Sequence, residues 1–228
     1  LAVHFELGHE FLKAAEYLYQ IAIVSVNLGA GVEAIISLER ALEILSKSPL
    51  TLERYRLELS LLQLLAPVII SVYGNAAPKV ERVYKDALKL CNLLSITAEQ
   101  FPISFGLRSY YLITGATDKA QRLSEELMVL SESVEDDGLK LEAHVGQASC
   151  LFFQGDLVHS YRHTEASSLH RILLGVLHRC TYDRDCARGN ARASPVKSTH
   201  RYFETIAFAT YDIGTRNFDI LKSNLVSR

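Results

Sequence analysis

Five glycine-marked turns punctuate an otherwise helical sequence of 228 residues. They lie at Gly8, Gly29, Gly74, Gly115 and Gly155, and the last four are 45, 41 and 40 residues apart. A helix, a tight turn and an antiparallel helix occupy about forty residues, so this spacing predicts a series of helix hairpins. Stacked hairpins form an extended surface rather than a catalytic pocket. The first inference is therefore a binding scaffold.

Between the turns, apolar residues recur with a period near 3.6, which indicates amphipathic helices. After a helix that ends at Gly8, the pattern predicts helices over residues 10–28, 32–46, 52–73, 79–94, 100–114, 118–132, 139–154 and 157–170. Residues 132–138 are expected to form an acidic loop. Residues 59–78 carry no charge, but Gln63, Pro67 and Gly74 interrupt them. We therefore interpret this stretch as a core helix rather than a membrane span.

The turns also share a register of small and apolar residues on the helix that follows them. Small residues where helices cross allow the two helices to approach closely. The positions five, nine and twelve residues after the turn, with one inserted residue after Gly74, are Ala34, Leu38 and Ala41; Val80, Tyr84 and Ala87; Ala120, Ser124 and Leu127; and Ser160, Thr164 and Ser167. This register resembles the tetratricopeptide repeat, with longer helices. The resemblance implies an all-α fold, a tetratricopeptide-like α-solenoid of antiparallel helix hairpins.

A narrower resemblance lies at the N-terminus, in AVHFELGHEFLKAAEYLYQIA and the following GAGVEAIISLERALEIL. These strings are similar to the helical-repeat region of large bacterial signalling ATPases, which are often linked to a cyclase or a serine/threonine kinase domain. The residues that carry the likeness are Ala2, His4, Phe5, Gly8, Lys13, Ala14, Tyr17, Gly29, Glu33, Ala34, Leu38 and Ala41. Later stretches such as YGNAAPKVERVYKDALKLC and FQGDLVHSYRHTE continue it to about residue 170.

The resemblance implies a regulatory or protein-binding region of a larger protein, without the ATPase itself. No phosphate-binding G-x-x-x-x-G-K-[ST] string occurs in the chain. We expect a non-catalytic scaffold in the bacterial cytoplasm, without a cofactor. Its partner would be a protein or peptide segment, such as a neighbouring domain of the same polypeptide. Four cysteines at no disulfide-scaffold spacing, Cys91, Cys150, Cys180 and Cys186, agree with a reducing compartment.

The charge divides the chain into two segments. Residues 1–170 carry a net charge of −7, whereas residues 171–228 carry +5. We therefore divide the chain into helical repeats over 1–170 and a basic C-terminal tail over 171–228. The tail offers a rival function, the binding of nucleic acid or an acidic partner. Because only Tyr182 and Tyr202 lie nearby for base stacking, we favour nonspecific charge over nucleic-acid binding.

The candidate partner-binding residues lie on the helices that precede the turns: Arg54, Arg108, Tyr110, Tyr111 and His144. Packing or rim solvation is the alternative role for each. Chaperone-binding tetratricopeptide domains grip a terminal carboxylate with Lys and Asn, ten and six residues before the turn. The corresponding residues before Gly29 are Tyr19 and Ile23, which supply no cation. The chain would instead favour an apolar helix or extended segment.

The remaining polar groups predict neither a catalytic nor a metal site. A zinc site in the tail would use His170, His178, Cys180, Cys186 and His200, but the two cysteines are not closely spaced and no second pair exists. Cys91 and Cys150 are expected to be inert core thiols. The acidic loop lacks the spacing of a calcium loop. A helical hydrolase or transferase with an unrecognised site remains the enzyme alternative, and it would require a deep pocket with converging titratable groups.

Overall fold

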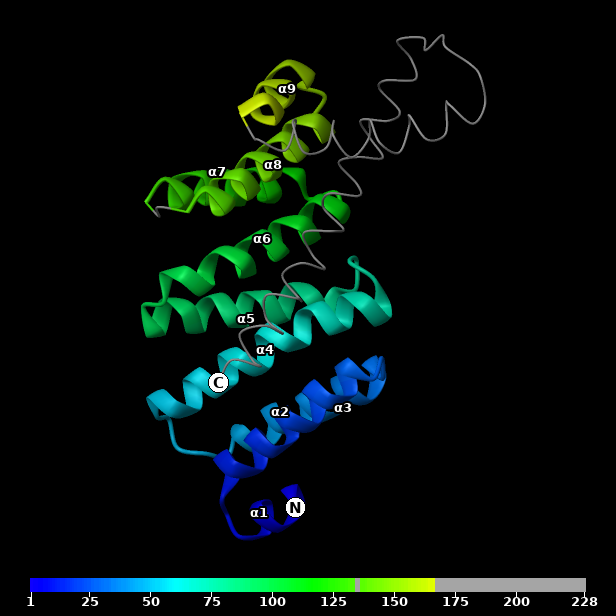
Figure 1. Cartoon of the computed structure of the whole chain (residues 1–228), viewed down its shortest axis with the longest axis vertical. Helices are drawn as coiled ribbons and strands as arrows, with labels where there is room; N and C mark the ends of the chain where they lie inside the picture. Colours follow the sequence, from blue (N-terminus) through cyan, green and yellow to red (C-terminus); the bar gives the residue numbers. More distant parts are fainter. Residues whose placement is uncertain (134–135, 167–228) are drawn as a thin grey trace, which may run out of the picture. The chain divides into compact units, whose positions relative to one another are not determined.

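Every element of the described residues, 1–133 and 136–166, is an α-helix in the computed structural model (Figure 1). Two sets of helices are separated at Ala116, because the chain divides there into two compact units, Leu1–Ala116 and Thr117–Arg228. The first unit holds α1 (Ala2–Leu7), α2 (Phe11–Asn27), α3 (Gly31–Leu45), α4 (Leu52–Tyr73), α5 (Pro78–Leu94) and α6 (Thr97–Ile113). The described part of the second holds α7 (Thr117–Glu132), α8 (Asp137–Phe153) and α9 (Leu157–Ala166).

The all-α prediction is confirmed for the described residues, and the helices begin and end within a few residues of the predicted ranges. The glycines of the four regular turns have φ values of +75° at Gly29, +87° at Gly74, +80° at Gly115 and +85° at Gly155. L side chains rarely adopt this conformation, so the sequence requires glycine at these four positions. The first turn differs, because His9 has the positive φ, 59°, in place of Gly8.

The repeated register corresponds to the most deeply buried positions of the downstream helices. Ala34, Leu38 and Ala41 have no exposed surface, and the equivalent residues of α7 are at most 1% exposed. Ser160 occupies the first register position of α9 and is also buried. The turn glycine and the small residues after it therefore set where each helix meets its neighbours, as helix-packing geometry requires. Ser167, the last register position, lies outside the described residues.

In the first unit each helix packs against the next in chain order, and α2 also contacts α4 (Figure 1). The central helix α4 contributes the largest apolar core, with Leu61, Leu65 and Ile69 at most 2% exposed. It is the one helix of the described residues that is long and apolar enough to span a membrane by length and composition. Its buried side chains contact neighbouring helices, which is the behaviour of a core helix.

A glycine permits the closest contact between α5 and α6. A Cβ atom on Gly106 would lie 2.3 Å from the Tyr84 ring, which is closer than any real contact. The ring of Tyr84 therefore packs directly on the backbone of α6, and burial raises the pKa of its hydroxyl. This contact explains how the large Tyr84 side chain fits at a register position: the small residue that makes room for it, Gly106, is on the facing helix.

In the second unit α8 packs against both α7 and α9. Polar side chains mediate both contacts. The Ser124 hydroxyl of α7 lies 3.1 Å from the Cys150 thiol of α8, and the Ser160 hydroxyl of α9 donates to the Ala148 carbonyl at 2.8 Å. At the start of α8, the Asp136 carboxylate accepts from the backbone N–H groups of Gly138 and Leu139. The described part of the acidic loop thus caps a helix.

The division at Ala116 falls inside the hairpin predicted from residues 100–114 and 118–132. The pairing of α6 with α7 therefore stays a prediction, and so does the assignment of residues 1–170 to one repeat array. The basic tail, with its histidines and cysteines, lies outside the described residues. The zinc and nucleic-acid alternatives that depend on the tail stay untested for the same reason.

Candidate partner-binding surfaces

Arg54 connects the loop after α3 to the first turn of α4. Its guanidinium donates to the Ser48 carbonyl at 2.9 Å, and its Nε lies 3.8 Å from the Glu58 carboxylate. The Thr51 hydroxyl caps the same turn by accepting from the Arg54 backbone N–H. Only 13% of the Arg54 side chain is exposed. Arg54 thus holds the connection between α3 and α4 in place. This is a packing role, the alternative to partner binding.

The side chain of Arg108, on α6, is buried inside the first unit rather than exposed to solvent. Its guanidinium carbon is 4.4 Å from the centre of the Phe105 ring, and it donates to the Ser109 hydroxyl. The residue is fully buried. Cation–π stacking and hydrogen bonding offset part of the cost of burying this charge.

Tyr110 and Tyr111 are adjacent, buried, and in edge-to-face contact at 5.7 Å between ring centres. The Tyr111 hydroxyl donates to the Glu81 carboxylate of α5 at 2.9 Å, and Lys85 pairs with the same carboxylate at 2.7 Å. Burial, followed by Glu81, raises the pKa of the Tyr111 hydroxyl. Tyr111 therefore connects α6 to a charged group on α5.

His144 belongs to the second unit, where its Nδ1 atom lies 3.0 Å from Nδ1 of His163. The two rings come from α8 and α9 and are half-buried. Burial lowers the pKa of both imidazoles, and the positive charges of His144 and His159 lower that of His163 further. The sequence spacing of these histidines matches no ligand motif, so sequence reasoning did not pair them.

The five candidate residues are distributed over three helices, α4, α6 and α8. The tyrosines contact each other on α6, which also carries Arg108, whereas Arg54 is on α4 and His144 is in the other unit. Four of the five have most of their surface packed against the protein. A direct role in partner binding stays a prediction for each, and their observed contacts are structural.

Sequence reasoning missed an exposed apolar stripe on α2. Ile21 and Val24 of α2, and Leu28 at its C-cap, recur at spacings of three and four residues, so they lie on the same side of the helix. They are 37%, 57% and 78% exposed, whereas Ala14, Ala15 and Ala22 face the core. The sequence does contain a sign of this surface. A helix needs one apolar stripe to pack against its neighbours, and α2 has two. We call these three residues the α2 stripe.

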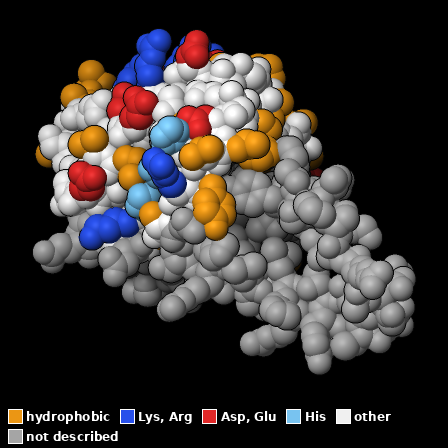
Figure 2. Space-filling view, turned by 90° about the horizontal axis from the view of Figure 1, so that it is seen from above, with side chains coloured by type: hydrophobic (Ala, Val, Ile, Leu, Met, Phe, Trp, Pro, Cys, Tyr) orange, Lys and Arg blue, Asp and Glu red, His pale blue; other side chains and the backbone are white. Residues whose placement is uncertain are grey.

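A second apolar surface lies at the end of α8 and on α9. Phe153, Leu157, Val158 and Tyr161 are each at least half exposed. Figure 2 views the α9 end and shows hydrophobic side chains beside histidine and basic side chains. A mixed surface of this kind is typical of protein interfaces, in which apolar contacts lie within a polar rim.

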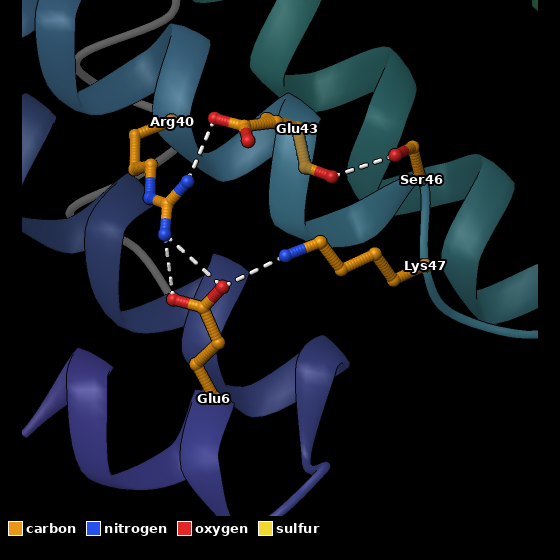
Figure 3. Close-up of polar contacts among 5 residues, drawn as sticks. All are labelled: Glu6, Arg40, Glu43, Ser46 and Lys47. Atoms are coloured by element: carbon orange, nitrogen blue, oxygen red, sulfur yellow. Dashed lines mark hydrogen bonds and ion pairs between the residues drawn. The ribbon is translucent and has the colours of Figure 1, made fainter.

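Charged side chains fix the short helix α1 to α3. Figure 3 shows the Glu6 carboxylate between Arg40 and Lys47. Arg40 donates to both Glu6 oxygens at 3.0 and 2.8 Å, and Lys47 donates to one of them at 2.9 Å. These cations lower the pKa of Glu6. Arg40 also donates from Nη1 to Glu43 at 2.7 Å, and its Nη2 atom is the donor to both Glu6 oxygens.

The buried nucleophilic side chains of the described residues include Cys91 and Ser149. No group of three or more His, Cys, Asp or Glu residues within the described ranges could hold a metal ion. Burial raises the pKa of the Cys91 thiol to about 11, so it is protonated near neutrality and a poor nucleophile. The Ser149 hydroxyl donates to the Val145 carbonyl of its own helix.

Comparison with known proteins finds a similarity in fold. No family model and no curated protein matches the sequence. The chain is similar to the crystal structure of BtubC (BKLC) from P. vanneervenii, with a TM-score of 0.60 and 15% identity. The match covers 71% of this chain and 65% of that chain. At this identity the likeness extends to the arrangement of helices alone, and the chain spans only part of the length of BtubC.

Proposed function

We propose that this chain is a non-catalytic protein-binding scaffold, a tetratricopeptide-like α-solenoid that regulates a larger cytoplasmic signalling ATPase. The repeated register carries the proposal: four glycine turns of positive φ are each followed by a buried residue five positions later, or six after Gly74, namely Ala34, Val80, Ala120 and Ser160. A series of similar hairpins presents a row of helices, and such rows serve as extended binding surfaces. The N-terminal resemblance to signalling ATPases supplies the regulatory context.

The α2 stripe is the part of this scaffold best suited to bind a protein segment. Exposed aliphatic side chains on one helix face lose water when a partner covers them, and this burial favours association. Lys13, Glu16 and Gln20 are exposed on the same helix and would form the polar edge of such a contact. The partner best matched to the surface is an apolar or amphipathic segment, such as one from a neighbouring domain.

Site-specific photo-crosslinking tests this function. A benzophenone amino acid at Val24 should cross-link to a discrete protein partner in extracts of the source cells. The same probe at Arg82 of α5, whose side chain is 86% exposed, is the matched control. A product obtained from Val24 and absent from Arg82 supports a specific scaffold. Identical products from both positions, or none from Val24, would contradict it.

A second variant separates binding from folding. Val24→Ser replaces an exposed side chain, so we expect a change in unfolding free energy within about 0.5 kcal/mol. The cross-linked partner identified from an adjacent position, Ile21, should nevertheless be lost or much reduced. Retention of that partner would remove the α2 stripe from the binding surface.

A further inference from the structure

In the second unit, His144 of α8 contacts His163 of α9, so two titratable side chains meet across the interface between these helices. The two Nδ1 atoms are 3.0 Å apart and the ring centres are 5.2 Å apart. A bond at this distance requires one Nδ1 to carry a proton and the other to accept it. The neutral pair meets this condition when its two rings are in different tautomers.

Protonation acts on this contact in two steps. The first added proton converts the donor ring to imidazolium, which still donates its Nδ1–H to the neutral ring. The second proton must enter at the accepting Nδ1, so both rings then point N–H donors at each other. The contact is lost at this step, and two like charges remain face to face between α8 and α9.

The surroundings provide little to offset the second charge. From α7, Glu132 is the carboxylate that favours the charged form of His144. From α9, His159 adds a further positive charge near His163. His159 itself is held by Asp156 at 2.7 Å, so that carboxylate is already paired on its own helix. Both imidazoles of the contact are half-buried, which limits screening by water.

We propose that the His144–His163 pair is a pH-sensitive clasp that holds α9 against α8 while at most one of the two rings is charged, and that releases α9 when both are charged. The surface controlled by the clasp is the apolar one formed by Leu157, Val158 and Tyr161 on α9. Mild acid would therefore change the position of α9, and with it the exposure of this surface. The inference does not depend on which partner the repeats bind.

The sign of the effect follows from burial. Burial lowers the pKa of both imidazoles in the folded unit, so their contribution to stability is complete above the ordinary histidine pKa of 6.5. The stabilisation is lost as pH falls below 6.5 and through the lowered values. The α2–α3 hairpin contains no histidine within its helices, and it provides an internal reference in the same molecule.

Hydrogen exchange of the full chain between pH 7.5 and 5, corrected for intrinsic exchange rates, tests the clasp in the presence of a chelator. We expect protection of the α9 amides to fall by about tenfold, while protection of the α2 and α3 amides changes by less than about twofold. His163→Asn keeps a neutral group near the Nδ1 position and should abolish the extra loss. His159→Asn removes only a neighbouring positive charge and should keep most of the loss, whereas His9→Asn in the first unit is the control and should keep all of it.

Equal behaviour of the wild type and His163→Asn would overturn the proposal. If the variant loses α9 structure at every pH, nitrogen-detected NMR of the wild-type imidazoles decides the question. The clasp requires coupled titration of the two rings, with the second protonation at least about one unit below the first. Two independent titrations near the ordinary value would contradict it.

Discussion

The two compact units share one helix–turn–helix pattern, but they differ in how much of the contact between helices is polar. In the first unit the interior consists mainly of Leu61, Leu65, Ile69 and other apolar residues, with Arg108 and Tyr111 of α6 as polar exceptions. In the described part of the second, apolar residues such as Leu127 and Phe152 are also buried, and hydroxyls, a thiol and half-buried imidazoles lie between the helices. The register thus determines which positions are buried. The chemistry of the residues at those positions determines how strongly the free energy of unfolding depends on pH. Apolar burial depends weakly on pH, and titratable contacts depend on it strongly.

Removing a core side chain from the first unit should produce the largest effect. Leu65→Ala deletes a side chain that is 2% exposed at the centre of α4. We expect a loss of about 3 kcal/mol in unfolding free energy, from lost burial and the cavity that remains. Urea unfolding followed by helical circular dichroism, with hydrogen exchange to assign the unit, measures it. A loss below about 1 kcal/mol would show that α4 is not a core helix.

Adding one methyl group at the α5–α6 contact should have the next largest effect. In an ordinary exposed helix, Gly→Ala stabilises by roughly 0.5–1 kcal/mol. At Gly106 the new Cβ would overlap the Tyr84 ring, so Gly106→Ala should destabilise the first unit by about 2 kcal/mol. The same urea experiment determines the sign. A stabilised variant would show that α6 does not approach Tyr84 this closely.

The second unit should respond to the loss of a single hydroxyl. Ser160→Ala removes the hydrogen bond from α9 to the Ala148 carbonyl of α8. We expect a loss of about 1 kcal/mol, seen as faster exchange of the α9 amides. Ser25→Ala is the control, because its hydroxyl bonds to Ile21 within its own helix and lies in the first unit. Equal effects from the two variants would contradict a special role for polar contacts in the second unit.

The effect expected at Glu142 is no larger than that at Ser160, and it has the opposite sign. Burial, followed by Asp136, raises the pKa of this carboxyl to about 7. Stability conferred by the protonated form is complete below the ordinary pKa of 4.5 and is lost as pH rises through 7. Glu142→Gln should therefore stabilise the second unit at pH 8 by about 1 kcal/mol, after allowance for solvent screening, and leave pH 4 unchanged. Stability measured at both pH values provides the check.

The fold of the described residues was predictable because its signals are local. Glycine at a left-handed turn and a 3.6-residue apolar period act within one hairpin, so the helix ranges followed from the sequence. Contacts between distant side chains left no such pattern. Gly106 lies 22 residues from Tyr84 and His144 lies 19 residues from His163, and neither spacing is periodic. That the members of each pair are in contact is seen only in the three-dimensional structure.

The candidate site was harder to predict than the fold, because exposure on a helix depends on what packs beside it. Arg108, Tyr110 and Tyr111 are polar or aromatic residues on an upstream helix, but α6 packs them inside. The α2 stripe consists of aliphatic residues, which sequence reasoning assigns to the core by default. Which of the two apolar stripes of α2 is covered depends on how α1, α3 and α4 pack against it.

The backbone conformation of the four turns tests the central claim, a repeated hairpin register, most directly. Backbone NMR of the full chain yields the sign of φ at Gly29, Gly74, Gly115 and Gly155, together with the helix bounds on both sides. We predict a positive φ at all four glycines, with helices that end at each turn and begin again after it. Helices that continue through these glycines, or extended strands beside them, would contradict the account.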